Sequence, residues 1–162
     1  MSRPSAVVLT VSDSVASGRR EDVSGPVVKA ELKKKFQVIK VEVVADDYAS
    51  IETALRRLAG EADLVVTTGG TGIAERDVTP EATRAVCSRL LDGVAERMRA
   101  QGAKKTPFAA LSRAVCGVCG KSLILNLPGS PKGAVESLEA VMDLLPHAID
   151  LLRGKTEHTA AR

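Results

Sequence analysis

The fold of this 162-residue chain is decided by the stretch Leu64-Val65-Val66-Thr67-Thr68-Gly69-Gly70-Thr71-Gly72. An apolar, β-branched run of this kind is typical of a buried strand, and here it ends abruptly in a glycine-rich turn. Glycine lacks the Cβ atom that would keep backbone N–H groups away from a ligand, and it tolerates positive φ. Consecutive amides at a strand end form a concave anion site. The stretch therefore predicts a phosphate-binding turn, and a tight turn without a ligand is the competing interpretation.

The sequence around the turn differs from two well-known phosphate-binding motifs. The chain has no G-x-x-x-x-G-K-[ST] motif, and Glu75 stands where the G-x-G-x-x-G fingerprint needs its third glycine. Thr79-Pro80 predicts a helix start, with Thr79 as N-cap and Pro80 as the first helical residue. Asp77 lies between turn and helix, and its carboxylate can bind a divalent cation or orient a phosphate.

Strand and helix patterns alternate on both sides of this stretch. We expect strands over 5–11, 38–44, 64–67, 112–118 and 122–127. We expect a helix that begins at Ser24-Gly25-Pro26, with Ser24 or Gly25 as its N-cap. Further helices are expected over 51–60, from Thr79, over 93–100, and from about 131 to 152 with a break at Pro146. This alternation predicts an α/β fold, a three-layer sandwich with a mostly parallel central sheet and helices on both faces. Residues 1–154 are expected to form a single domain, and residues 155–162 a flexible C-terminal tail.

Four polar segments follow the ends of predicted strands. They are Ser12-Asp13, Asp46-Asp47, Thr68 to Gly72 with Asp77, and Asn126 to Ser130. In open parallel sheets, ligands bind beyond the carboxyl ends of the strands. We therefore expect one pocket to gather these segments.

Composition excludes several other classes of function. A net charge of +3 and an aromatic content of 2% offer neither a basic footprint nor stacking platforms for nucleic acid. No apolar run approaches the roughly 20 residues of a membrane span. The first five residues lead directly into a strand pattern, so we expect no signal peptide and a cytoplasmic protein.

Cys116-Gly-Val-Cys119 has the spacing of a redox or zinc motif. A structural zinc needs four ligands, and the remaining candidates, Cys87, His147 and His158, are scattered through the chain. Thioredoxin-like pairs begin a helix, whereas this pair lies in a strand pattern. We therefore interpret these cysteines as small core residues.

The residues described above carry a family resemblance. The chain resembles the molybdenum-cofactor biosynthesis proteins of the MoaB/Mog type, from about Ala6 to Gly154. The matching pieces are Thr67-Thr68-Gly69-Gly70-Thr71-Gly72, Arg76-Asp77-Val78-Thr79-Pro80-Glu81-Ala82, Ser112-Arg113 and Leu127-Pro128-Gly129-Ser130-Pro131-Lys132. Within this family it looks more like the molybdopterin adenylyltransferases. Such enzymes transfer AMP from ATP to the terminal phosphate of molybdopterin, using Mg²⁺ and releasing pyrophosphate.

The resemblance implies roles for particular residues. Asp77 and Asp46 would be the catalytic and metal-binding carboxylates, although the neighbouring Asp47 is a second candidate for the latter position. The resemblance and the polar segments at the strand ends together predict the substrate- and phosphate-binding residues. These are Ser12, Asp13, Thr68, Gly69, Gly70, Thr71, Gly72, Pro128, Gly129, Ser130 and Lys132. It also implies a homotrimer, and it makes a molybdate-insertion protein a candidate partner.

The candidate site residues suit adenylyl transfer. It requires in-line positioning and neutralisation of phosphate charge, and it requires no serine or cysteine nucleophile. The alternative function is a non-catalytic molybdopterin-binding carrier or scaffold protein. The presence of both Asp46 and Asp77 favours the enzyme.

Overall fold

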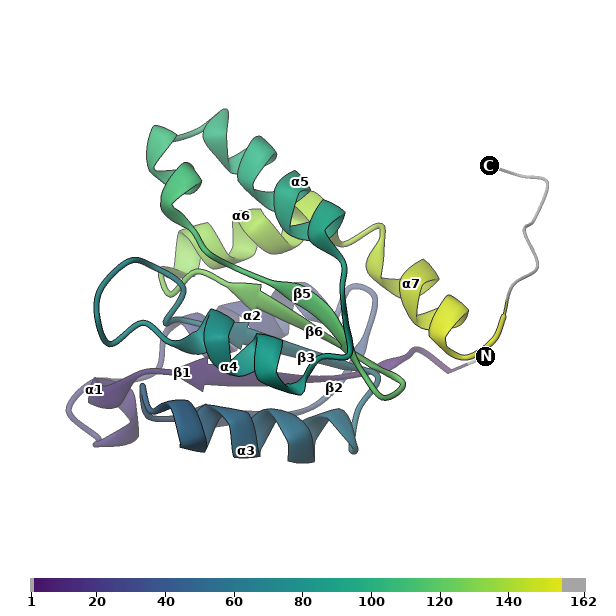
Figure 1. Cartoon of the computed structure of the whole chain (residues 1–162), viewed down its shortest axis with the longest axis horizontal. Helices are drawn as coiled ribbons and strands as arrows, with labels where there is room; N and C mark the ends of the chain where they lie inside the picture. Colours follow the sequence, from purple (N-terminus) through teal and green to yellow (C-terminus); the bar gives the residue numbers. More distant parts are fainter. Residues whose placement is uncertain (1, 156–162) are drawn as a thin grey trace.

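The computed structural model describes residues 2–155, and within them six strands form one mixed sheet (Figure 1). The strands are β1 (Ser5–Val11), β2 (Gln37–Val44), β3 (Leu64–Thr68), β4 (Arg89–Leu90), β5 (Cys116–Cys119) and β6 (Ser122–Leu127). Their order across the sheet is β2-β1-β3-β6-β5-β4. The first four strands in this order run parallel, and β5 is antiparallel to both of its neighbours. The prediction of a mostly parallel sheet is confirmed.

Helices cover both faces of the sheet, which confirms the three-layer architecture (Figure 1). One face carries α2 (Ser24–Leu32), α5 (Asp92–Ala103), α6 (Pro131–Val141) and α7 (Leu145–Leu152), and the other carries α3 (Tyr48–Ala59) and α4 (Thr79–Val86). Two short elements lie in connections: α1 (Asp13–Ala16) after β1, and the 3₁₀ helix η1 (Pro107–Leu111) after α5. The break near Pro146 is confirmed, because α7 begins beside this proline.

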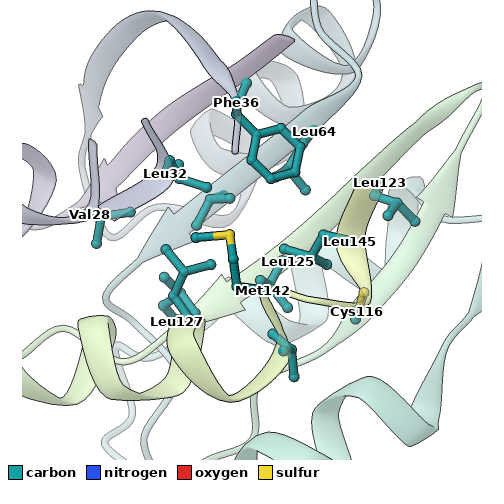
Figure 2. Packing of buried hydrophobic residues seen from close by; sticks show 14 of the residues in the cluster. Val28, Leu32, Phe36, Leu64, Cys116, Leu123, Leu125, Leu127, Met142 and Leu145 are labelled. Carbon is teal, nitrogen blue, oxygen red and sulfur yellow. The ribbon is translucent and has the colours of Figure 1, made fainter. Parts of the chain in front are cut away.

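Alternation along the strands builds two aliphatic cores. Val8, Val66 and Leu125 point to the face covered by α2 and α6, whereas their neighbours Val7 and Val65 point to the face covered by α3 and α4. Figure 2 shows the first core, in which Val28, Leu32 and Phe36 lie near Leu64 and Met142. Both cores are contiguous across β1, β3 and β6, so these three strands form the rigid centre of the molecule.

Two predicted helix caps are wrong. Thr79 is the first residue of α4, and its hydroxyl donates to the carbonyl oxygen of Gly69 at 3.0 Å; Val78 occupies the N-cap position. Neither Ser24 nor Gly25 caps α2, because both already lie within it. Val23 occupies the N-cap position, and the carboxylate of Asp22 beside it accepts from the Gly25 amide at 2.9 Å.

Other departures concern short segments. The polar segment after β1 contains the helical turn α1, capped by Ser12. The strand expected over 112–118 begins only at Cys116, and the two-residue strand β4 was not predicted. Of the expected tail 155–162, residues 156–162 lie outside the described residues. Among the helices of the described region, each is too short or too polar to traverse a bilayer.

The three cysteines are free thiols in or beside the sheet. Burial raises the pKa of the Cys116 thiol to about 12 and that of the Cys87 thiol to about 11, so both are protonated at neutral pH. Within residues 2–155 no three His, Cys, Asp or Glu side chains are grouped so as to hold a metal ion. The burial of Cys116 and the partial burial of Cys87 and Cys119 against the second core agree with the interpretation of these cysteines as small core residues.

A buried amide connects the end of β6 to both neighbouring layers. Asn126 is fully buried, and its side-chain nitrogen donates to the hydroxyls of Thr67 and Thr83, each at 3.0 Å. Its side-chain oxygen accepts from the amide of Val115 at 3.1 Å. Asn126 therefore belongs to the core and not to the pocket that was expected to gather residues 126–130.

We expect Asn126→Ala to lower the free energy of unfolding by about 2–4 kcal/mol. The buried groups of Thr67, Thr83 and Val115 would lose their hydrogen-bond partner, and a cavity would remain. Urea denaturation measures this loss of stability. The matched control is Gln37→Ala, which removes an exposed amide from β2 and should change the stability by less than about 0.5 kcal/mol. Similar losses in the two variants would contradict a structural role for the buried network.

Candidate active site

The glycine turn follows β3 and has the backbone geometry that the sequence predicted. Gly69 and Gly70 have φ values of +105° and +70°, which L residues with a side chain rarely adopt. Gly72 has no positive φ, and its missing Cβ makes room instead for Asp77 Oδ2, which lies 2.9 Å from the position this atom would take. Gly72 therefore accommodates the Asp77 carboxylate and does not serve a positive φ.

Carbonyl groups of the turn are tied to neighbouring elements. The hydroxyl of Thr79 donates to Gly69 O, and its amide donates to Gly70 O at 3.1 Å. The amides of Gly70, Thr71 and Gly72 donate to no acceptor within residues 2–155. Fixed carbonyls and uncommitted amides are the arrangement that an anion-binding loop requires.

A second turn, after β6, packs against the first. The hydroxyl of Thr68 donates to Pro128 O at 2.7 Å, and Gly69 Cα lies 3.3 Å from the position of a Cβ on Gly129. Ser130 then caps α6 by accepting from the Gly133 amide at 3.1 Å. The two turns therefore form one continuous rim at the carboxyl ends of β3 and β6.

A cleft of about 440 Å³ opens on one side of this rim. It gathers the polar segments after β1, β2, β3 and β6, as the topology predicted. Acidic side chains outnumber basic ones in its lining: Asp13, Glu21, Asp22, Asp46 and Asp77 against Arg20 and Arg76. The N-termini of α2 and α6 also reach it, at Ser24 and Ser130, and contribute partial positive charge.

Asp46 and Asp13 are joined by two hydrogen bonds in the lining of the cleft. The Asp13 amide donates to Asp46 Oδ2 at 3.0 Å, and the Asp46 amide donates to Asp13 Oδ1 at 2.8 Å. Burial, and then the charges of Asp13 and Asp77, raise the pKa of Asp46, although its hydrogen bond from Asp13 and the charge of Arg76 oppose this rise. A cation bound here would relieve this cost of ionisation.

Asp46 and Asp47 have separate tasks. Asp47 is the N-cap of α3, where its carboxylate accepts from the amide and the hydroxyl of Ser50 at 2.9 and 2.6 Å. These hydrogen bonds lower the pKa of Asp47. Asp46 instead lines the cleft, and its Oδ1 lies 3.3 Å from the Cβ position that Gly70 leaves empty. Of the two, Asp46 is thus the carboxylate that faces the glycine turn.

A larger cavity of about 720 Å³ opens on the opposite side of the rim. Gly70, Asp77, Gly129 and Ser130 line both cavities, so the rim separates them. Its lining combines apolar side chains from α5 and η1 with the cationic Arg99, Lys104 and Lys105 and the acidic Asp77, Glu136 and Glu139. Phe108, which is 75% exposed, is the only aromatic residue that the described part of the chain contributes to either lining.

Most of the expected site residues are brought together around this rim. Ser12, Asp13, Thr68, Gly69 and Asp46 line the acidic cleft, while Thr71, Gly72 and Pro128 line the larger cavity. Lys132 is the exception: its side chain is 88% exposed and lines neither cavity.

Sequence reasoning missed the basic residues of the larger cavity. Lys104 and Lys105 lie where the helical pattern stops, between α5 and η1. This interruption is the signal that could have marked them, because binding residues concentrate on connections held by a rigid scaffold. By itself, however, the interruption indicates only that a helix ends.

Known proteins with a similar sequence share this architecture. The chain is 45% identical over 152 residues to a molybdopterin adenylyltransferase of Helicobacter pylori strain J99, which covers 91% of this chain and 86% of that protein. It is 38% identical over 170 residues to a molybdopterin adenylyltransferase of Escherichia coli K12, with 94% and 87% covered.

Solved structures and a family match agree. The molybdopterin biosynthesis enzyme MoaB from Thermus thermophilus is similar with a TM-score of 0.88 at 50% identity, over 94% of this chain and 98% of that one. Residues 7–147 match the family described as a probable molybdopterin binding domain. The chain therefore belongs to this molybdopterin-binding family of molybdenum-cofactor biosynthesis proteins of the MoaB/Mog type.

Proposed function

We propose that this chain is a molybdopterin adenylyltransferase. An oxygen of the molybdopterin phosphate attacks the α-phosphorus of ATP, the bond from that phosphorus to the bridging oxygen breaks, and pyrophosphate leaves. The observation that carries the proposal is the shared rim, whose uncommitted amides lie between two cavities. Two phosphorylated substrates, one in each cavity, would present their phosphates to the same loop.

The contrast between the cavities favours one arrangement of the substrates. The acidic cleft would repel a bare triphosphate, so it suits a triphosphate that arrives with a divalent cation. The larger cavity has three basic side chains against three acidic ones, in place of the acidic excess of the cleft, and its cations and exposed phenylalanine suit a flat ring system carrying a phosphate. We therefore assign ATP to the cleft and molybdopterin to the larger cavity.

The donor set of the cleft fits Mg²⁺. This ion prefers oxygen ligands and keeps several waters, so one or two carboxylates and the substrate phosphates suffice. Asp46 and Asp77 would hold it, with Asp13 beside them. When bound, Mg²⁺ supplies positive charge that offsets the charge of the phosphates.

Backbone amides and helix N-termini of the protein would bind and align the phosphates. The amides of Gly70, Thr71 and Gly72 would donate to phosphate oxygens, and the N-termini of α2 and α6 would add a favourable dipole. Catalysis would then consist of alignment and charge stabilisation, because the attacking atom belongs to the substrate.

We also propose the domain organisation, oligomeric state, location and partner of the enzyme. We propose that residues 1–154 form a single molybdopterin-binding domain, that the protein is a cytoplasmic homotrimer, and that a molybdate-insertion protein receives the adenylated product. The family match over residues 7–147 supports the single domain, and the trimer, the location and the partner are what the family resemblance implies.

The proposal predicts AMP transfer that depends on ATP, Mg²⁺ and molybdopterin together. Purified protein should convert molybdopterin to its adenylated form with one pyrophosphate released per product, and chelation of Mg²⁺ should abolish turnover. Chromatography of the product and a pyrophosphate assay measure the two yields. Molybdopterin binding without any transfer would instead identify a carrier or scaffold.

Asp77→Asn should lower kcat about a hundredfold or more, because it keeps the shape of the side chain but removes a ligand charge. Asp46→Asn should behave likewise. The matched control is Asp47→Asn, which preserves the cap of α3, since asparagine is also a good N-cap, and which should retain nearly full activity.

Steady-state kinetics at several Mg²⁺ concentrations, together with thermal melting, compare these three variants. Full activity of Asp77→Asn with an unchanged Mg²⁺ requirement would count against its role. Equal losses at positions 46 and 47 would show that the assignment of the second carboxylate is wrong.

A further inference from the structure

One arginine outside both cavities is bonded to the glycine turn at several points. The amide of Arg113 donates to Thr71 O at 2.9 Å, its Nε donates to Gly72 O at 2.8 Å, and its Nη2 donates to Asp77 O at 2.7 Å. Arg113 therefore holds three carbonyls of the segment 71–77, which follows the glycines and carries Asp77.

The remaining nitrogen of this guanidinium anchors it to α4. Arg113 Nη1 contacts Glu81 Oε2 at 2.5 Å, in the first turn of that helix. This ion pair is partly exposed, with side-chain exposures of 36% and 48%, so it contributes little by itself. Its effect is to orient the planar guanidinium, whose other two nitrogens then meet two carbonyls in fixed directions.

These bonds fix the direction of the loop amides. The N–H and C=O of one planar peptide unit point in opposite directions. The carbonyls of Thr71 and Gly72 face Arg113, so the amides of Gly72 and Ile73 point away from it. Neither amide donates to an acceptor within the described residues. Arg113 lines neither cavity, so it can shape this surface without touching a ligand in it.

We infer that Arg113 is a positioning residue, which holds segment 71–77 in its anion-binding conformation before a phosphate arrives. The inference rests on the proposed function in that the anion is a phosphate of one of the substrates. Lysine cannot replace this arginine, because a single ammonium cannot meet two carbonyls and a carboxylate in one plane.

The first test is hydrogen–deuterium exchange of the free protein, followed by mass spectrometry. In Arg113→Lys, the hydrogen-bonded amides of segment 71–77, those of Ala74 and Asp77, should exchange about tenfold faster, which corresponds to one lost charge-assisted bond. Arg97→Lys is the matched control, because Arg97 Nε also donates to a carbonyl, that of Ala140 at 2.8 Å, and pairs with Asp143. It should leave exchange in 71–77 unchanged. Unchanged exchange in Arg113→Lys would overturn the inference.

The second test is calorimetric titration of Arg113→Ala with inorganic pyrophosphate and Mg²⁺. We expect the Kd to rise about tenfold or more, and millimolar ethylguanidinium to restore most of the affinity. The melting temperature should stay within a few degrees of the wild-type value. Global destabilisation without rescue, in this variant and in Arg113→Lys, would show a merely structural role.

These tests separate the inference from the proposed function. If the wild-type protein binds no pyrophosphate, the proposed phosphate site is contradicted, while the exchange experiment still decides whether Arg113 orders the loop. If the wild type transfers AMP and Arg113→Lys does so with unchanged kcat and KM, the enzyme assignment stands and the positioning role of Arg113 is refuted.

Discussion

The parallel pairing of β1, β3 and β6 is the constraint on which the rest of the structure depends. Parallel strands end at the same edge of a sheet, so the loops after them converge there. Because β2 pairs with β1 on the side opposite β3, successive connections lead to opposite sides of β1. The acidic cleft lies at this switch point, between the ends of β1 and β3, and the rim turns after β3 and β6 close it. The site is thus positioned by the cores on both faces of the sheet.

Much of this arrangement could be predicted from the sequence, because strong local signals coincide with the global topology. The run 64–72 specifies a buried strand and a turn that only glycine tolerates at Gly69 and Gly70. What could not be predicted depends on tertiary contacts. Thr79 looks like an N-cap, but its hydroxyl donates to Gly69 O, which belongs to a distant strand end. Strand β4 has two residues, which are too few to show any periodicity. Asp46 and Asp47 are identical neighbours in the sequence, and only the structure shows that Asp46 lines the cleft while Asp47 caps α3.

Charge is distributed unevenly around the rim, and this distribution connects the fold to the proposed chemistry. Carboxylates gather on the side of the cleft, where burial already raises the pKa of Asp46. Such a cluster opposes binding of an anion unless a cation accompanies it. The larger cavity is lined by as many basic as acidic side chains, Arg99, Lys104 and Lys105 against Asp77, Glu136 and Glu139, so it opposes a bound phosphate less than the cleft does. Between them, the backbone of the rim contributes donors that carry no net charge and remain in place whichever cavity is filled.

The most direct test of the proposed site is a crystal structure with a non-hydrolysable ATP analogue and Mn²⁺ in place of Mg²⁺, measured by anomalous diffraction. We predict a manganese peak within bonding distance of Asp46 or Asp77, and phosphate oxygens within hydrogen-bond distance of the amides of Gly70, Thr71 or Gly72. Phosphates bound away from the glycine turn, with manganese at neither carboxylate, would contradict the proposed site.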